Sequence, residues 1–71
     1  MAIIKVKEII GTSPNSFEDA LQNAINHACE EKQNVTGAKI VGQAVAIEDG
    51  RIVEYKVNVK IAYRWEKELH Q

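Results

Sequence analysis

Cysteine, histidine and carboxylate side chains are the groups in this chain that could act as nucleophiles, general bases or metal ligands. Cys29 is the only cysteine, and His27 lies two positions away, which places it on a different side of a helix. A thiol nucleophile needs a base within reach, so we expect Cys29 to be a small buried hydrophobe beside Ala28. His27 and His70 are too far apart in the sequence to form a metal-ligand motif.

The carboxylates form no recognisable pair of acid and base, because they are spread over helix caps, turns and exposed strand positions. A calcium loop alternates carboxylates along one short segment, and this sequence contains no such run. These observations predict that the protein is not an enzyme, and they leave any metal ligands unknown.

Two further groups of residues could bind a ligand. The segment Gly11-Thr12-Ser13 precedes a helix start and could hold an anion through free backbone N–H groups. It has one glycine and no following Gly-Lys-Ser/Thr, which excludes a nucleotide-binding P-loop and favours a plain turn with a helix cap. Tyr63 and Trp65 could stack on a planar ligand, but both lie in an apolar strand row, which favours a core or a subunit interface.

That apolar row belongs to a strand in which apolar and polar residues alternate, so one side of it is predicted to be buried. The row consists of Val53, Tyr55, Val57, Val59, Ile61, Tyr63 and Trp65. About 13 residues of strand span roughly 40 Å, whereas a compact domain of this size has a radius of gyration of only about 11 Å. A single chain cannot cover such a row, so we expect the protein to assemble with copies of itself.

The first half of the chain is predicted to form a strand and then a helix. The strand covers about residues 2–10, is rich in β-branched residues, and stops in a turn at Gly11. The helix covers about residues 16–33, because Ser16 and Asp19 approximate a capping box and an alanine-rich apolar stripe follows. The narrow stripe predicts that the helix lies close against a sheet.

The second half is predicted to form a hairpin of two long strands. The strand at about 35–48 is joined by Asp49-Gly50, a strong hairpin signal, to the strand at about 51–65. A polar tail follows at 66–71, so the whole chain, 1–71, is expected to be one domain.

Small residues mark one face of the strand at about 35–48, where the alternation places Ala38, Ile40, Gly42, Ala44 and Ala46 together. Gly37 and Gly42 are candidates for a bend or bulge. The order of elements predicts an α+β fold, β-α-β-β, in which one helix covers a three-stranded sheet and the last strand lies between the other two.

Composition limits the partners. The net charge is −1, with 9 basic and 10 acidic residues, so no nucleic acid and no membrane surface is implied as a partner. The segment Met1 to Lys7 lacks the long apolar region of a signal peptide, and no apolar run approaches the roughly 20 residues of a membrane span. We therefore expect a cytoplasmic protein.

The sequence resembles the dodecin family. The resemblance is carried by Ile9-Ile10-Gly11-Thr12-Ser13-Pro14 before Ser16-Phe17, by the alanine-rich helix, and by the ending Val59-Lys60-Ile61-Ala62-Tyr63-Arg64, and it covers about residues 3–65. It implies a non-enzymatic protein whose long bent antiparallel sheet wraps partly around its helix, with a homododecamer forming a hollow shell.

The resemblance also implies where a flavin would bind. Flavin-binding dodecins sequester riboflavin or FMN in pairs between tryptophans of two subunits, and a glutamine bonds the edge of the ring. The tryptophan position corresponds to Gly37 and the glutamine position to Lys56, so both groups are replaced in this chain. Acidic positions on the polar side of the ligand correspond to Gly42 and Ala46, which have no polar side chain.

These replacements disfavour paired-flavin binding. The sequence therefore predicts a dodecin-like small-ligand binding or storage shell, with Gly37 and Lys56 as the matched cofactor positions. Sequestration of riboflavin or FMN is the first alternative, and a structural shell or an ion-binding shell with sites at subunit junctions is the second.

Overall fold

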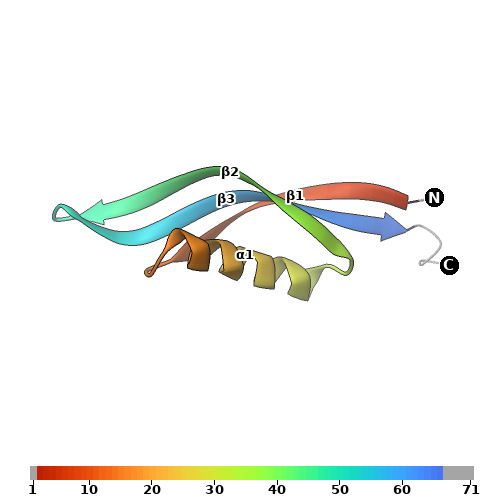
Figure 1. The fold of residues 1–71 in the computed structure, drawn as a ribbon, viewed down its shortest axis with the longest axis horizontal. Coiled ribbons are helices and arrows are strands. Elements are labelled where there is room, and N and C mark those ends of the chain that lie inside the picture. Colours follow the sequence, from red (N-terminus) through yellow and green to blue (C-terminus); the bar gives the residue numbers. More distant parts are fainter. Residues whose placement is uncertain (1, 67–71) are drawn as a thin grey trace.

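The computed structural model describes residues 2–66 of the chain, which form three strands and one helix. Their order is β1 (Ala2–Ser13), α1 (Phe17–Glu31), β2 (Val35–Glu48) and β3 (Arg51–Glu66). The sheet has the order β1-β3-β2, and both pairs of neighbours are antiparallel. The predicted α+β fold is confirmed, including the central place of the last strand (Figure 1).

Pairing with β3 defines two faces of the sheet, because residues directly opposite each other in neighbouring strands point to the same side. The closed face, which packs against α1, carries the odd-numbered residues of β3, with Val57, Val59 and Ile61 at its centre. The open face lies on the other side and carries the even-numbered residues of β3. Along β1 the register runs without interruption from the pair of Ala2 and Glu66 to the pair of Ser13 and Tyr55.

The core is the centre of the closed face. Val57, Val59 and Ile61 of β3 are at most 1% exposed and pack against three buried alanines of α1, which are Ala20, Ala24 and Ala28. Ile9, Phe17, Leu21 and Val35 are partly buried around this cluster. The alanines follow one another every four residues, so they form a flat stripe that lets the helix lie close to the sheet.

The helix begins where the sequence predicts. The side chain of Ser16 accepts a hydrogen bond from the backbone N–H of Asp19 at 3.0 Å, which is the helix cap. Glu18 and Asp19 place negative charge in the first turn, where the helix dipole favours it. Lys32 caps the other end, so α1 closes slightly before the predicted end at residue 33.

The prediction that the first strand stops at Gly11 is wrong. Gly11 pairs with Val57 in the middle of the sheet, and β1 continues to Ser13. A Cβ atom at Gly11 would collide with the backbone carbonyl of Ala20 and would lie 2.8 Å from the Cβ of Ala24. The glycine is therefore explained by close approach of the helix rather than by a turn.

The prediction of one small-residue face along β2 is also wrong, because the strand contains bulges. The register shifts between Val35 and Gly37 and again between Ile40 and Gly42, at the two glycines suspected from the sequence. Ala38 and Ile40 oppose Ile61 and Val59 on the closed face, whereas Gly42, Ala44 and Ala46 oppose Asn58, Lys56 and Glu54 on the open face. An extra residue at a bulge reverses the alternation beyond it.

The sheet is much longer than the helix (Figure 1). The chain measures 55 × 19 × 14 Å and has a radius of gyration of 14.7 Å, above the value of about 11 Å typical of a compact domain of this length. The β2–β3 hairpin extends beyond the start of α1, and the opposite end of the sheet extends beyond its end. Within one chain only the middle of the apolar row in β3 is therefore buried, and Val53 is 40% exposed.

Candidate functional site

The open face of the sheet carries a shallow cavity of about 280 Å³. Its lining comes from all three strands and consists of Ile10, Gly42, Gln43, Ala44, Lys56 and Asn58. Asn58 is at its centre, since it pairs with Ile10 on one side and with Gly42 on the other. Lys56 is the one charged residue of the lining. Ile10 and Ala44 supply apolar surface, and Lys56 and Asn58 are two adjacent polar side chains on the open face of β3, whereas Gln43 opposes the closed-face residue Val57.

Asn58 contributes an unsatisfied acceptor to this cavity. Its side-chain oxygen Oδ1 is buried and has no hydrogen-bond partner among the residues that the structure describes. A buried acceptor without a partner costs about 1–3 kcal/mol of stability relative to a satisfied one. The residue at the neighbouring bulge explains why Oδ1 has no cross-strand partner, because Gly42 has no side chain that could bond to Asn58.

Lys56 lies beside Asn58 on the same face and is half-buried. Within residues 2–66, no ion pair is formed by its ammonium group. Glu54 is the next residue along this face of β3, and the cross-strand neighbours of Lys56 are the uncharged Thr12 and Ala44. The cavity therefore presents a cation without a counter-ion next to an acceptor without a donor.

Gly37, the other cofactor position predicted from the sequence, does not lie in this cavity. It opposes Ala62, six residues along β3 from Lys56, which corresponds to about 20 Å. Both residues are on the open face, so one planar ligand could contact both positions only if they came from different subunits. A Cβ at Gly37 would have no atom within 4 Å, and the backbone there has no positive φ, so the position has room for a side chain to begin there.

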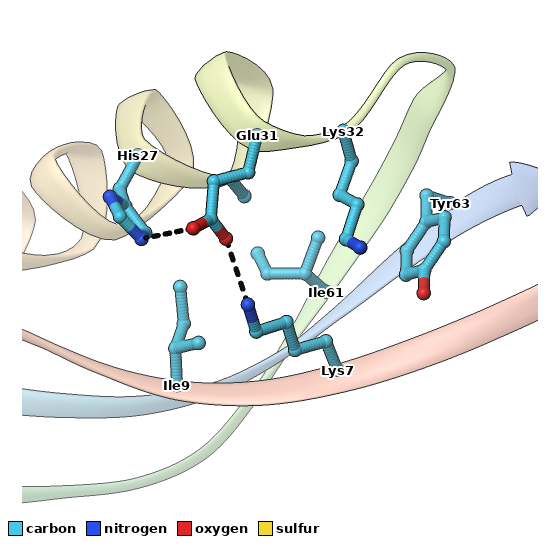
Figure 2. A pocket seen from close by; sticks show the side chains of 8 residues that line it. Lys7, Ile9, His27, Glu31, Lys32, Ile61 and Tyr63 are labelled. Carbon is cyan, nitrogen blue, oxygen red and sulfur yellow. Dashed lines mark hydrogen bonds and ion pairs between the residues drawn. The ribbon is translucent and has the colours of Figure 1, made fainter.

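A second polar cluster joins α1 to β1 on the closed face (Figure 2). Lys7 Nζ of β1 donates to Glu31 Oε1 at 2.8 Å, and His27 Nε2 lies 3.6 Å from Glu31 Oε2. The cavity beneath them has an accessible volume of about 10 Å³, with Ile9 and Ile61 in its lining. That is the space of about one water molecule, so this cluster fastens the helix to the sheet and is not a ligand pocket.

Among the groups in the described part of the chain, the carboxylate of this cluster is the one whose pKa departs clearly from its ordinary value. The pKa of Glu31 is lowered, mainly by the hydrogen bond from Lys7 and by the positive charge of that ammonium group. All three members are well exposed to solvent, so the ion pair is screened and its stabilising effect is small.

The segment at the start of α1 is not an anion site. Ser13 is buried, its hydroxyl donates to Asp19 Oδ2 at 2.7 Å, and its oxygen accepts from the backbone N–H of Asn15 at 2.9 Å. The hollow beside it is lined partly by the carboxylates of Glu18 and Asp19, which repel an anion. In the described part of the chain, no three His, Cys, Asp or Glu side chains gather as metal ligands would.

Cys29 is exposed, so the prediction of a buried cysteine is wrong. Each step along a helix turns the side chain by about 100°, and Ala28 already occupies the direction of the sheet.

Two aromatic residues of β3 contact lysines near the end of the sheet that extends beyond the end of α1. Lys5 Nζ lies 4.8 Å from the ring centre of Trp65, and Lys32 Nζ lies 5.2 Å from that of Tyr63.

Sequence reasoning found Lys56 but missed Asn58 and Ile10. A signal was present, because Asn58 is a short amide in the polar half of an otherwise strictly alternating strand. Its role depends on Ile10 and Gly42 as neighbours, and that pairing follows from the sheet register and the bulge.

No helix in residues 2–66 has the length and apolar character needed to cross a bilayer.

Comparison with known proteins gives consistent matches along almost the whole chain. The family model described as dodecin matches residues 3–66. Calcium dodecin of Mycobacterium tuberculosis is 28% identical over 64 residues, which cover 90% of each chain. The solved dodecin of Streptomyces coelicolor has a TM-score of 0.90 and 27% identity, covering 93% of this chain and 94% of its own. Dodecin of Streptomyces davaonensis has a TM-score of 0.88 and 29% identity, covering 93% and 97%.

Proposed function

The chain belongs to the dodecin family, and on this basis we propose that it is a non-enzymatic small-ligand binding or storage protein that assembles into a hollow homododecameric shell. The observation that carries the ligand-binding role is the cavity on the open face, where Lys56 and Asn58 both lack a partner within the described residues. The proposal keeps the cytoplasmic location expected from the sequence, with no nucleic acid and no membrane as partner.

Assembly is supported by the apolar surface that a single chain leaves uncovered. On the open face of β1, Ile4 and Val6, which lie outside the cavity, are each more than half exposed. At the hairpin tip, Ile47 is 62% exposed and Ile52 is 50% exposed. Large apolar side chains exposed at both ends of one sheet are typical of interfaces in small proteins. Copies of the same chain are the occupants we propose, because the sheet ends that α1 does not cover need apolar partners.

Light scattering on the purified protein tests the assembly. A dodecamer of chains of 8.0 kDa has a mass of about 96 kDa. Val6→Glu places a charge in the exposed stripe of β1 and should shift the particle to smaller species, whereas Gln33→Glu, outside the sheet, should leave the mass unchanged. A stable monomer of about 8 kDa at micromolar concentration would contradict the proposal.

Sequestration of riboflavin or FMN is the first alternative, and the family relationship supports it. Wild-type protein should quench riboflavin fluorescence weakly or not at all, because Gly37 offers no ring and Lys56 offers only a donor. Gly37→Trp should recover most of the binding, since one stacked ring contributes about 1–3 kcal/mol in other proteins, and adding Lys56→Gln should strengthen it further. Tight, near-stoichiometric quenching by the wild type would make flavin storage the leading function.

An ion-binding or structural shell is the second alternative. The support for ion binding is the relationship to calcium dodecin, a protein whose solved structure is described as calcium chelating. Titration of calcium into the assembled protein, followed by calorimetry, tests it directly. Binding of calcium without any effect of Lys56→Gln would place the ion away from the open-face cavity.

A further inference from the structure

We propose, building on the small-ligand binding role above, that the open-face cavity binds small oxyanions, carboxylates or phosphates, that also carry a hydroxyl or N–H donor. Lys56 is the anion anchor and Asn58 is the acceptor for the donor. The inference deepens the proposed function by naming a ligand class, which differs from the stacked aromatic rings that the family resemblance implies.

The anionic part of the ligand follows from Lys56. Lys56 is a half-buried residue whose ammonium group forms no ion pair in the described part of the chain, so an anion in the cavity would supply the counter-ion that it lacks. Glu54 lies on the same face, but it does not line the cavity and forms no ion pair with Lys56. Lys60, on the other side of Asn58, and Lys39, opposite Lys60, add positive charge nearby, and Glu8 partly offsets it.

The donor part of the ligand follows from Asn58. Its Oδ1 has no partner within residues 2–66, and the terminal torsion of an asparagine side chain is soft, so the oxygen can turn toward a donor in the cavity. Gly42 keeps this space open, because a Cβ atom there would meet no atom within 4 Å. A ligand hydroxyl that bonds Oδ1 would remove the cost of the unsatisfied acceptor.

The spacing of the two groups limits the size of the ligand. Lys56 and Asn58 are two positions apart on one face of β3, which separates their Cα atoms by about 7 Å. A three-carbon chain with an anion at one end and a hydroxyl at the other spans this distance. Ile10 and Ala44 would contact its carbon atoms, and a volume of about 280 Å³ accommodates a molecule of this size.

Calorimetric titration with glycerol 3-phosphate, propyl phosphate and glycerol tests both parts of the inference. Glycerol 3-phosphate has the anion and the hydroxyls, propyl phosphate has the anion alone, and glycerol has the hydroxyls alone. We expect glycerol 3-phosphate to bind at least tenfold more tightly than either of the others. A comparison of 3-hydroxypropanoate with propanoate repeats the test with a carboxylate and shows whether the cavity prefers a carboxylate or a phosphate.

Three variants assign the effect to residues. Lys56→Gln should weaken binding of glycerol 3-phosphate about tenfold, and Asn58→Leu should abolish its advantage over propyl phosphate. Lys60→Gln removes the same charge from the same face outside the cavity and should change the affinity less than twofold in about 0.1 M salt, where exposed charges are screened. Equal losses in Lys56→Gln and Lys60→Gln, or unchanged affinity in Lys56→Gln, would overturn the inference.

Light scattering on each variant separates this inference from the proposed function. A protein that assembles and binds riboflavin or calcium, but does not bind glycerol 3-phosphate, would refute the oxyanion inference and leave the binding shell intact. A monomeric protein that binds glycerol 3-phosphate through Lys56 would refute the shell and support the inference, because one chain supplies all the residues that line the cavity.

Discussion

The two faces of β3 are built from alternate residues of one strand, yet their side chains have different surroundings. On the closed face, Val57 and Val59 are fully buried against the alanines of α1, and the space there is set by the volume of each side chain. On the open face, Lys56 and Asn58 line a shallow cavity with no helix over it. Substitution is therefore limited by packing on the closed face, whereas on the open face we expect it to be limited by the ligand or partner proposed above.

The largest expected difference between the faces concerns two glycines. Gly11→Ala should lower the free energy of unfolding by about 3 kcal/mol, because the new Cβ would collide with the carbonyl of Ala20 and with Ala24. Gly42→Ala should raise it by about 0.5 kcal/mol, since the Cβ has free space and alanine restricts the unfolded chain. Denaturant unfolding at one protein concentration measures both values. Equal losses at the two glycines would mean that the open face is as tightly packed as the closed face.

Two neighbouring residues of β3 provide a smaller difference. Val59→Ala leaves a cavity against the helix and should cost about 2 kcal/mol of stability. Lys60→Ala, on the open face, should change stability by less than about 0.5 kcal/mol. Thermal melting followed by circular dichroism compares the two variants. A loss at Lys60→Ala that matches the loss at Val59→Ala would refute the division into two faces.

The smallest expected effect concerns the ion pair between Lys7 and Glu31 at the edge of the closed face. The pKa of Glu31 is lower in the folded chain than its ordinary value of 4.5, so its stabilising effect is present above pH 4.5 and is lost as the pH falls further. Melting temperatures of wild type and Glu31→Gln should therefore differ slightly at pH 7 and converge as the pH falls well below 4.5. A difference that stays constant from pH 7 to pH 3 would exclude ionisation of Glu31 as its source.

The sequence predicted the fold because its strongest signals are local. Alternation in β3 identified the face that packs against α1, and Ser16 with Asp19 identified the start of the helix. Asp49 and Gly50 form the turn between the last two strands, and both have positive φ, as the hairpin signal requires.

The features that the sequence did not predict depend on contacts between distant segments. Gly11 was assigned to a turn because nothing near it in the sequence shows that Ala20 packs on its backbone. The small residues of β2 were assigned to a single face because a bulge changes the alternation without any change in residue type. The open-face cavity was missed for the same reason, since Asn58, Ile10 and Gly42 become neighbours only through the register of the sheet.

The bulge at Ile40 to Gly42 also determines where the chain can change in length. Ile40 opposes Val59 and Gly42 opposes Asn58, so Val41 is one residue more than the pairing requires. Loss of Val41 would leave every pair on both sides in place. Loss of one residue from the middle of β1, whose register has no interruption, would displace every pair on one side of the deletion. Of the two edge strands, β2 therefore tolerates a change of length that β1 does not.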